Sequence, residues 1–458
     1  YLIQTTTYLV MLYRFKKYLD HFSWISIEIK FLVIIIMTAL IIDMEISNTA
    51  HLTDQFISSD TGVIIFTMVS LTYLVTQQFI LNSYHKKQFE MQVESSSFRI
   101  IQRLINFMIL FLIISFLTIV LEIIISGYYD SIFLIVVLVV TNSITILAMV
   151  SIGFKFFSWY NSRRKLTILV FGVMSSTIAI TAFVTILFMV TILLGQPEKI
   201  DSDYDVVLPI IAQGSTLSVL NYLYYYLSIL SFTVTWIMTS LLLKDYSIKI
   251  GKFRYWIFLS LPLAFYLSQL LVTQFGFFIP KEDSDQLTFS FQFLFLYTLS
   301  SPIGGILFCL PYFLVIRKMN IDKSLQSYMK ILAYALLLFF AAGSATVYHT
   351  PYPPFGLSTV SIIGPSSYLI AIGVYYSARL VATNRIIENQ MRTSKKYSQF
   401  FASIGSAEME KTMTEIIEEI RKKLPAEKDE ILENPNFVDK EIIEFLKKYQ
   451  SRKKDKKN

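Results

Sequence analysis

The feature that most constrains this sequence is a succession of ten long apolar stretches. About 20 residues of α-helix span the hydrocarbon core of a bilayer. Because the backbone must satisfy its own hydrogen bonds there, such stretches form helices rather than open sheets. They cover residues 26–42, 62–81, 104–125, 131–154, 166–194, 216–243, 255–275, 287–316, 327–347 and 357–378. We therefore predict an all-α, polytopic membrane protein with about ten transmembrane helices.

The amino-acid composition agrees with a protein that is surrounded mainly by lipid. Of the 458 residues, 54% are hydrophobic and 16% are charged, whereas a soluble domain carries about 25% charged residues. The single cysteine, Cys309, excludes an internal disulfide, and the four histidines lack the spacing of metal ligands. We find no phosphate-binding loop, nucleophile elbow or paired intramembrane carboxylates. The sequence predicts a protein that is not an enzyme and has no metal or cofactor.

The connections between the apolar stretches alternate in charge. Basic residues gather near 14–17, 85–87, 163–165, 244–254 and 317–323, and the intervening connections are acidic or neutral. Since lysine and arginine accumulate on the cytoplasmic side of membrane proteins, both termini are expected in the cytoplasm. We expect three regions in a plasma membrane protein: a cytoplasmic or interfacial segment (1–25), a transmembrane helical domain (26–380) and a cytoplasmic tail of amphipathic helices (381–458). The start at Tyr1 rather than Met suggests that residues precede it.

Ionisable and aromatic residues have expected places at the membrane surface. The spans contain few ionisable groups, which disfavours an ion-driven pump. Glu122 lies near the predicted outer end of its stretch, which favours an interfacial carboxylate. Trp159, Tyr375 and Tyr376 lie near predicted inner ends and are expected to anchor the protein at the interface.

The stretch at 287–316 is interrupted by proline and glycine. These are helix-weakening residues, and in lipid the freed backbone groups must find partners in protein or water. One interpretation is a discontinuous helix that lines a ligand-binding site. The alternative is that the first part lies along the outer interface and a shorter helix crosses. The candidate ligand-binding residues are Ser300, Ser301, Pro302, Gly304 and Gly305.

A second interruption occurs in the last apolar stretch. Pro365 disfavours helical geometry at Gly364 and predicts a kink there. This pair is a candidate hinge, and the alternative is a tolerated membrane proline, since prolines are frequent in spanning helices.

The tail carries an amphipathic pattern with no chemistry of its own. Gly405 is expected to break the juxtamembrane helix, and Ser406 is expected to cap a new one. An apolar stripe at helical spacing predicts a surface for a cytoplasmic protein, for a second copy or for another tail helix. The stripe consists of Met409, Met413, Ile416, Ile420 and Leu424. The basic C-terminal run suits anionic headgroups, and it is too short and too poor in aromatics to predict a nucleic-acid partner.

The C-terminal third resembles a known group of sequences. The segments 351–361, 364–368 and 373–378, the proline and glycine pattern at 302–305, and the segment 403–409 are similar to multi-pass membrane proteins of ammonia-oxidising-type archaea. That group has no assigned activity. The resemblance implies an archaeal plasma membrane and no mechanism.

These observations leave three hypotheses for function. The first is a sensor or relay, or a partner-recruiting anchor, that receives a signal at the outer face or within the lipid and presents its tail to partners. The second is a channel or a transporter not coupled to ions, with its site at Ser300–Gly305. The third is a structural scaffold of the membrane.

Overall fold

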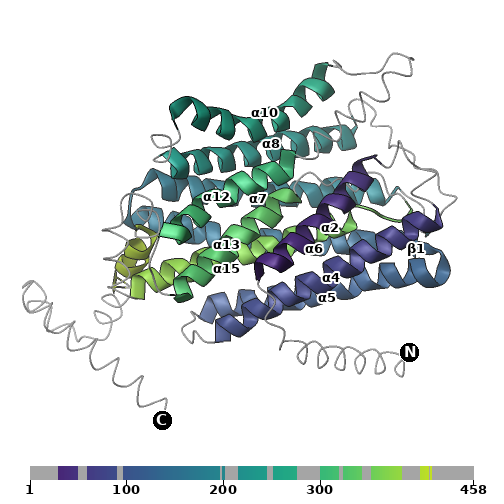
Figure 1. The fold of residues 1–458 in the computed structure, drawn as a ribbon, viewed down its shortest axis with the longest axis horizontal. Coiled ribbons are helices and arrows are strands. Elements are labelled where there is room, and N and C mark those ends of the chain that lie inside the picture. Colours follow the sequence, from purple (N-terminus) through teal and green to yellow (C-terminus); the bar gives the residue numbers. More distant parts are fainter. Residues whose placement is uncertain are drawn as a thin grey trace, which may run out of the picture.

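A computed structural model describes residues 29–49, 59–89, 96–195, 199–201, 215–244, 251–275, 300–318, 323–342, 352–383, 403–411 and 413–414. The predictions for residues 1–28, and for the tail beyond residue 414, lie outside these described residues. Helices dominate the described part (Figure 1). The all-α prediction is confirmed.

The helices in chain order are α2 (Ile29–Thr49), α4 (Asp60–Phe89), α5 (Ser96–Ser126), α6 (Ser131–Ser162), α7 (Leu166–Leu193), α8 (Thr216–Leu243), α10 (Lys252–Phe275), α12 (Ser300–Lys318), α13 (Lys323–Ala341), α14 (Leu357–Ser361) and α15 (Ile363–Thr383). A further helix covers residues 403–411 and is called the tail helix below. Within the described residues, six helices are long and apolar enough to cross a membrane: α4, α5, α6, α7, α8 and the α14–α15 unit. The chain is therefore suited to a multi-pass membrane protein.

Segments distant in sequence meet at the two ends of the bundle. At one end, β1 (Tyr128–Asp130) pairs antiparallel with β2 (Lys199–Asp201), which joins the connection between α5 and α6 to the one after α7. At the other end, the tail helix lies against the connection between α6 and α7, where Lys165 Nζ donates to Ser403 Oγ over 2.7 Å. Figure 1 shows β1 at the right end and the tail helix, in yellow-green, at the left end.

Glu122 has a structural contact at the β1 end. Its carboxylate accepts a hydrogen bond from the Asp130 backbone N–H over 3.1 Å. The Asp130 side chain in turn accepts from the Ile132 N–H over 2.9 Å and caps α6. The position at the end of α5 agrees with the prediction, and the contact ties α5 to the first turn of α6.

The α14–α15 unit lies at the centre of the bundle. Within it, 94% of the most apolar window is buried, against 28% to 50% for the other five candidate spans. It packs mainly against α6 and α13. A Cβ on Gly373 would lie 2.8 Å from Leu332 Cβ, so the glycine permits the close approach of α15 to α13.

The central position of α15 corrects the assignment of three aromatic residues. Trp159, Tyr375 and Tyr376 are all buried inside the protein rather than placed in the membrane interface. Tyr376 stacks on Tyr328 of α13 with ring centroids 5.2 Å apart. Interface anchors and core aromatics carry the same sequence signal at helix ends, and packing decides between them.

Asp43 is the most unusual buried residue. The sequence placed it in an outer connection, whereas the structure extends α2 to Thr49 and leaves the Asp43 side chain with no exposed surface. Its carboxylate accepts from Gly356 N at 3.0 Å, from Thr359 N at 2.9 Å and from Thr359 Oγ1 at 2.8 Å. A carboxylate is favourable at the N-terminus of a helix, where the first N–H groups have no helical partner. Asp43 therefore caps α14 from another helix.

Substituting Asp43 tests this cap. We expect D43A to lower the free energy of unfolding by about 2–4 kcal/mol, because three buried donors lose a charged acceptor. D60A is the control, because Asp60 lies exposed at the start of α4. Thermal unfolding in detergent measures both variants, and equal Tm values for D43A and D60A would contradict the capping role.

Candidate functional site

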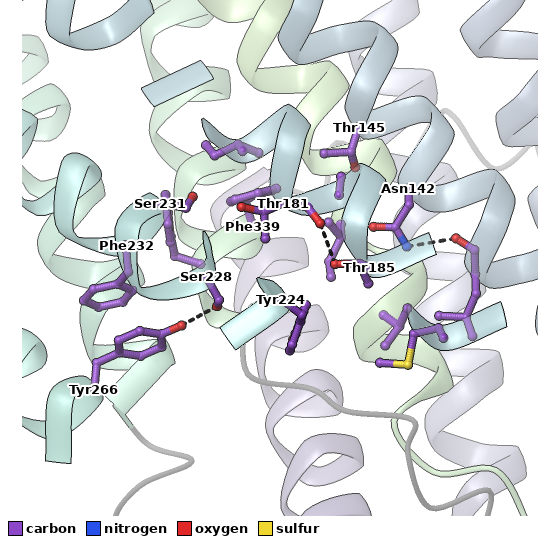
Figure 2. A pocket seen from close by; sticks show the side chains of 17 residues that line it. Asn142, Thr145, Thr181, Thr185, Tyr224, Ser228, Ser231, Phe232, Tyr266 and Phe339 are labelled. Atoms are coloured by element: carbon purple, nitrogen blue, oxygen red, sulfur yellow. Dashed lines mark hydrogen bonds between the residues drawn. The ribbon is translucent and has the colours of Figure 1, made fainter. Parts of the chain in front are cut away.

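A partly open cavity of about 100 Å³ lies between α6, α7, α8, α10, α13 and the α14–α15 unit (Figure 2). Among the described residues that line it, none has a carboxylate or a basic side chain. They are Leu138, Asn142, Thr145, Ile178, Thr181, Ala182, Thr185, Met189, Tyr224, Ser228, Ser231, Phe232, Tyr266, Phe339, Phe340, Val360 and Ile363. Ligand sites are mostly apolar concavities with a few placed polar groups, and this cavity has that character.

The wall formed by α6 and α7 carries hydroxyl groups that bond to their own helices. Thr181 Oγ1 donates to Thr177 O over 2.8 Å, and Thr185 Oγ1 donates to Thr181 O over 2.8 Å. On α6, Asn142 Nδ2 donates to Leu138 O over 2.9 Å. This back-bonding lets polar side chains remain in an apolar interior.

The opposite wall is aromatic. The hydroxyl groups of Ser228 on α8 and Tyr266 on α10 share a short hydrogen bond (Figure 2). The Tyr266 ring stacks on Phe232 with centroids 4.2 Å apart and an interplanar angle of 4°. Phe339 and Phe340 of α13 complete this side. A flat, uncharged ring fits between such walls.

The interruption between α14 and α15 borders the cavity. Val360 and Ile363, which lie on either side of Ile362, both line it. Pro365 has no N–H, so the Ser361 carbonyl lacks the donor that a continuous helix would supply.

Thr141 of α6 supplies the missing donor. Its Oγ1 donates to Ser361 O over 3.1 Å and accepts from the Gly364 N–H over 2.9 Å. A Cβ on Gly364 would lie 2.7 Å from Thr141 O, so only glycine permits this approach. One hydroxyl therefore satisfies both backbone groups freed by the interruption. The interruption itself lies at Ile362, and Gly364 and Pro365 are in the first turn of α15. The role of Gly364 and Pro365 as a hinge stays a prediction.

The predicted break at Ser300–Gly305 is wrong in its geometry. The helix α12 begins at Ser300 and runs to Lys318 without interruption, with Pro302 in its first turn, where proline is tolerated. Pro302, Gly304 and Gly305 do not line the cavity, and the side chains of Ser300 and Ser301 are not among those that the structure describes. The part of the stretch before Ser300 lies outside the described residues.

The two glycines of α12 serve packing behind the cavity. A Cβ on Gly304 would lie 3.1 Å from the Phe232 ring, and one on Gly305 would lie 2.7 Å from Leu337 O. Gly304 therefore packs against Phe232, whose ring lines the cavity, and does not line the cavity itself. A ligand-binding role for Ser300–Gly305 stays a prediction.

The tail helix is docked rather than broken. Gly405 and Ser406 lie inside a helix that includes residues 403–411, which corrects the predicted break and cap. Gly405 is where the tail helix touches Val381 of α15, with no room for a Cβ. Ile404 and Ala407 are fully buried. The tail is thus attached to the cavity's central helix.

Polar contacts hold the tail helix to the end of α6. Trp159 Nε1 donates to Glu408 Oε2 over 2.7 Å, and Arg163 Nε forms an ion pair with Glu410 Oε2 at 3.1 Å. Of the predicted partner-binding stripe, Met409 is 39% exposed and Met413 is half-buried. Ile416, Ile420 and Leu424 lie outside the described residues. Met409 is therefore accessible while the tail helix is docked.

Sequence reasoning missed the cavity because its residues come from six regions of the chain. A usable signal was the series Thr177, Thr181 and Thr185, which places three hydroxyl groups on one face of α7. Asp43 was missed because it follows an apolar stretch directly and reads as the start of a loop.

Comparison with protein-family models finds no match, and comparisons with curated proteins and with solved structures find none either. The resemblance to membrane proteins of ammonia-oxidising-type archaea therefore stays a prediction. The fold and the cavity define a helical, multi-pass type of protein with an uncharged internal site.

A double-mutant cycle tests the role of Thr141. We expect T141V to lower the free energy of unfolding by about 1–3 kcal/mol, because two buried backbone groups lose their partner. In P365A the alanine N–H can donate to Ser361 O, so T141V should cost about 1 kcal/mol less in that background. Thermal unfolding of the four proteins measures the coupling, and strictly additive effects would contradict the assignment.

Proposed function

We propose that this protein is a membrane sensor that binds a small uncharged molecule in the central cavity and signals through its tail. The observation that carries this proposal is the position of α14 and α15. Val360 and Ile363 border the cavity at the interruption, and Val381 contacts Gly405 of the tail helix near the far end of α15. One buried helix thus connects the binding site with the output element.

The proposal includes ten transmembrane spans with both termini in the cytoplasm. The meeting of connections at the two ends supports this topology. The connections joined by β1 and β2 both belong to the acidic or neutral set, and the tail helix contacts the basic connection at 163–165. These contacts agree with the alternation in charge along the chain.

Labelling of intact cells tests the topology. In a C309A background we expect K199C in β2 to react with a membrane-impermeant thiol reagent and R164C to be protected. Both side chains are exposed at opposite ends of the bundle, so accessibility reports the side of the membrane. The reverse pattern would invert the topology and place the tail outside.

The tail is proposed to act on a cytoplasmic protein or on a second copy. The partner-binding residues proposed are Met409, Met413, Ile416, Ile420 and Leu424. Methionine-rich surfaces adapt to partners because the side chain is unbranched and flexible. Signal-dependent release of the docked tail helix would uncover the buried Ile404 beside this stripe.

Filling the cavity tests the coupling to the tail. We expect A182F, which places a ring in the cavity, to change the labelling rate of I404C by about 5-fold or more, since coupling between sites is of this order. Ile404 is fully buried when the tail is docked, and the native Cys309 is replaced by alanine. I180F is the control, since Ile180 lies on the exposed face of α7. Equal rates in A182F and I180F would contradict the relay.

Transport of an uncharged molecule is the second candidate. It is favoured by the contact of Gly304 with Phe232, because movement of α12 would act directly on a cavity wall. Removal of the chain after Thr383 should abolish the relay and leave transport intact. Uptake by reconstituted vesicles, measured with the full and shortened chains, separates the two functions.

A further inference from the structure

We infer that the ligand of the central cavity is a single-ring molecule that donates a hydrogen bond to the α6–α7 wall. This inference deepens the proposed function and rests on it. The ligand is the donor of this hydrogen bond and the protein is the acceptor, as the contacts of two threonines indicate.

The threonines of α7 offer acceptors and no donors. A threonine hydroxyl has one hydrogen and two lone pairs. Thr181 Oγ1 donates to Thr177 O over 2.8 Å, with Leu227 O of α8 as a second acceptor at 3.3 Å, and Thr185 Oγ1 donates to Thr181 O over 2.8 Å. Both side chains line the cavity (Figure 2). What remains available to a ligand at these two positions is lone pairs.

Thr145 of α6 extends this acceptor surface. Its hydroxyl donates to Thr141 O over 3.1 Å and lies 3.1 Å from the Ser367 hydroxyl, whose own hydrogen has the shorter contact, 2.7 Å, with Gly364 O. Thr145 therefore also presents a lone pair. A ligand group that only accepts hydrogen bonds would face lone pairs at three positions. A buried acceptor without a donor loses the hydrogen bond it made in water. The three threonine positions therefore favour N–H or O–H groups over ethers, carbonyls and halides, while Asn142 of α6 donates one of its two amide hydrogens to Leu138 O.

The size and the opposite wall define the rest of the ligand. The cavity of about 100 Å³ is partly open, so a ring can extend past this volume, which compares with the roughly 150 Å³ of a closed cavity that holds benzene in a protein core. It is bordered by the stacked rings of Tyr266 and Phe232. A single aromatic ring suits this space, with its donor directed at α7. Because the lining contains no charged side chain, an ion would lose its hydration without compensation, which favours a neutral molecule.

Two probes of nearly equal size separate donor recognition from ring binding. 4-Fluorophenol carries an O–H group where 1,4-difluorobenzene carries a second fluorine. We expect 4-fluorophenol to bind the full-length protein in detergent about 3- to 10-fold more tightly, as one neutral hydrogen bond provides. Titrations followed by ¹⁹F NMR measure both dissociation constants.

Variants of α7 locate the acceptor. T181V and T185V replace each hydroxyl by a methyl group, and we expect the preference for 4-fluorophenol to fall toward 1 in the double variant. T181S keeps the hydroxyl and should keep the preference. The matched control is T191V, because Thr191 makes the same bond to its own helix, with Oγ1 donating to Leu187 O over 2.7 Å, and does not line the cavity.

Each other outcome rejects a defined part of the inference. Equal affinity of the two probes for the natural protein overturns the donor requirement and leaves the cavity as a binding site. A preference that survives in T181V/T185V overturns the assignment to α7. Failure of both probes to bind rejects the cavity as a site for a single ring, and the sensor proposal then depends on the A182F result alone.

Discussion

The structure depends on hydrogen-bond partners for the backbone groups that are left free where the buried α14–α15 unit is interrupted. The central α14–α15 unit, the most deeply buried of the candidate spans, is interrupted at Ile362, and the freed backbone groups need partners. Thr141 bonds to the freed groups on both sides of the interruption, and Asp43 holds the first N–H groups of α14. These contacts join α2 and α6 to the central unit.

The same requirement gives the cavity its chemical character. The threonine hydroxyl groups of α7 donate hydrogen bonds to backbone carbonyl oxygens of the same helix, because a buried donor without a partner is costly. The result is a space with neutral walls, acceptors on one side and aromatic rings on the other. The interruption in the central helix borders this space. A bound ligand would therefore contact the same residues that determine the position of α15.

Sequence reasoning succeeded where a signal is local. Apolar length predicted the helical class, because it acts within a segment. Pro365 predicted a kink at Gly364, and the interruption lies two residues earlier, at Ile362. Sequence reasoning failed where the environment decides. Trp159 was placed at the membrane interface, yet it is buried against the tail and donates to Glu408. The glycines at 304 and 305 were interpreted as breaking α12, yet their positions are explained by the neighbours Phe232 and Leu337.

The sequence by itself determined that this chain is helical and suited to a membrane, since hydrophobicity over about 20 residues is a property of a segment and not of its neighbours. Only the tertiary structure decided which helix is central, that Asp43 caps a helix more than 300 residues away, and that side chains from six regions enclose one cavity. These are relations between segments distant in the chain. The sequence pattern of one segment does not identify the segment it packs against, because many apolar faces and hydroxyl groups are compatible with it. The partner is determined only by the close packing of the complete bundle.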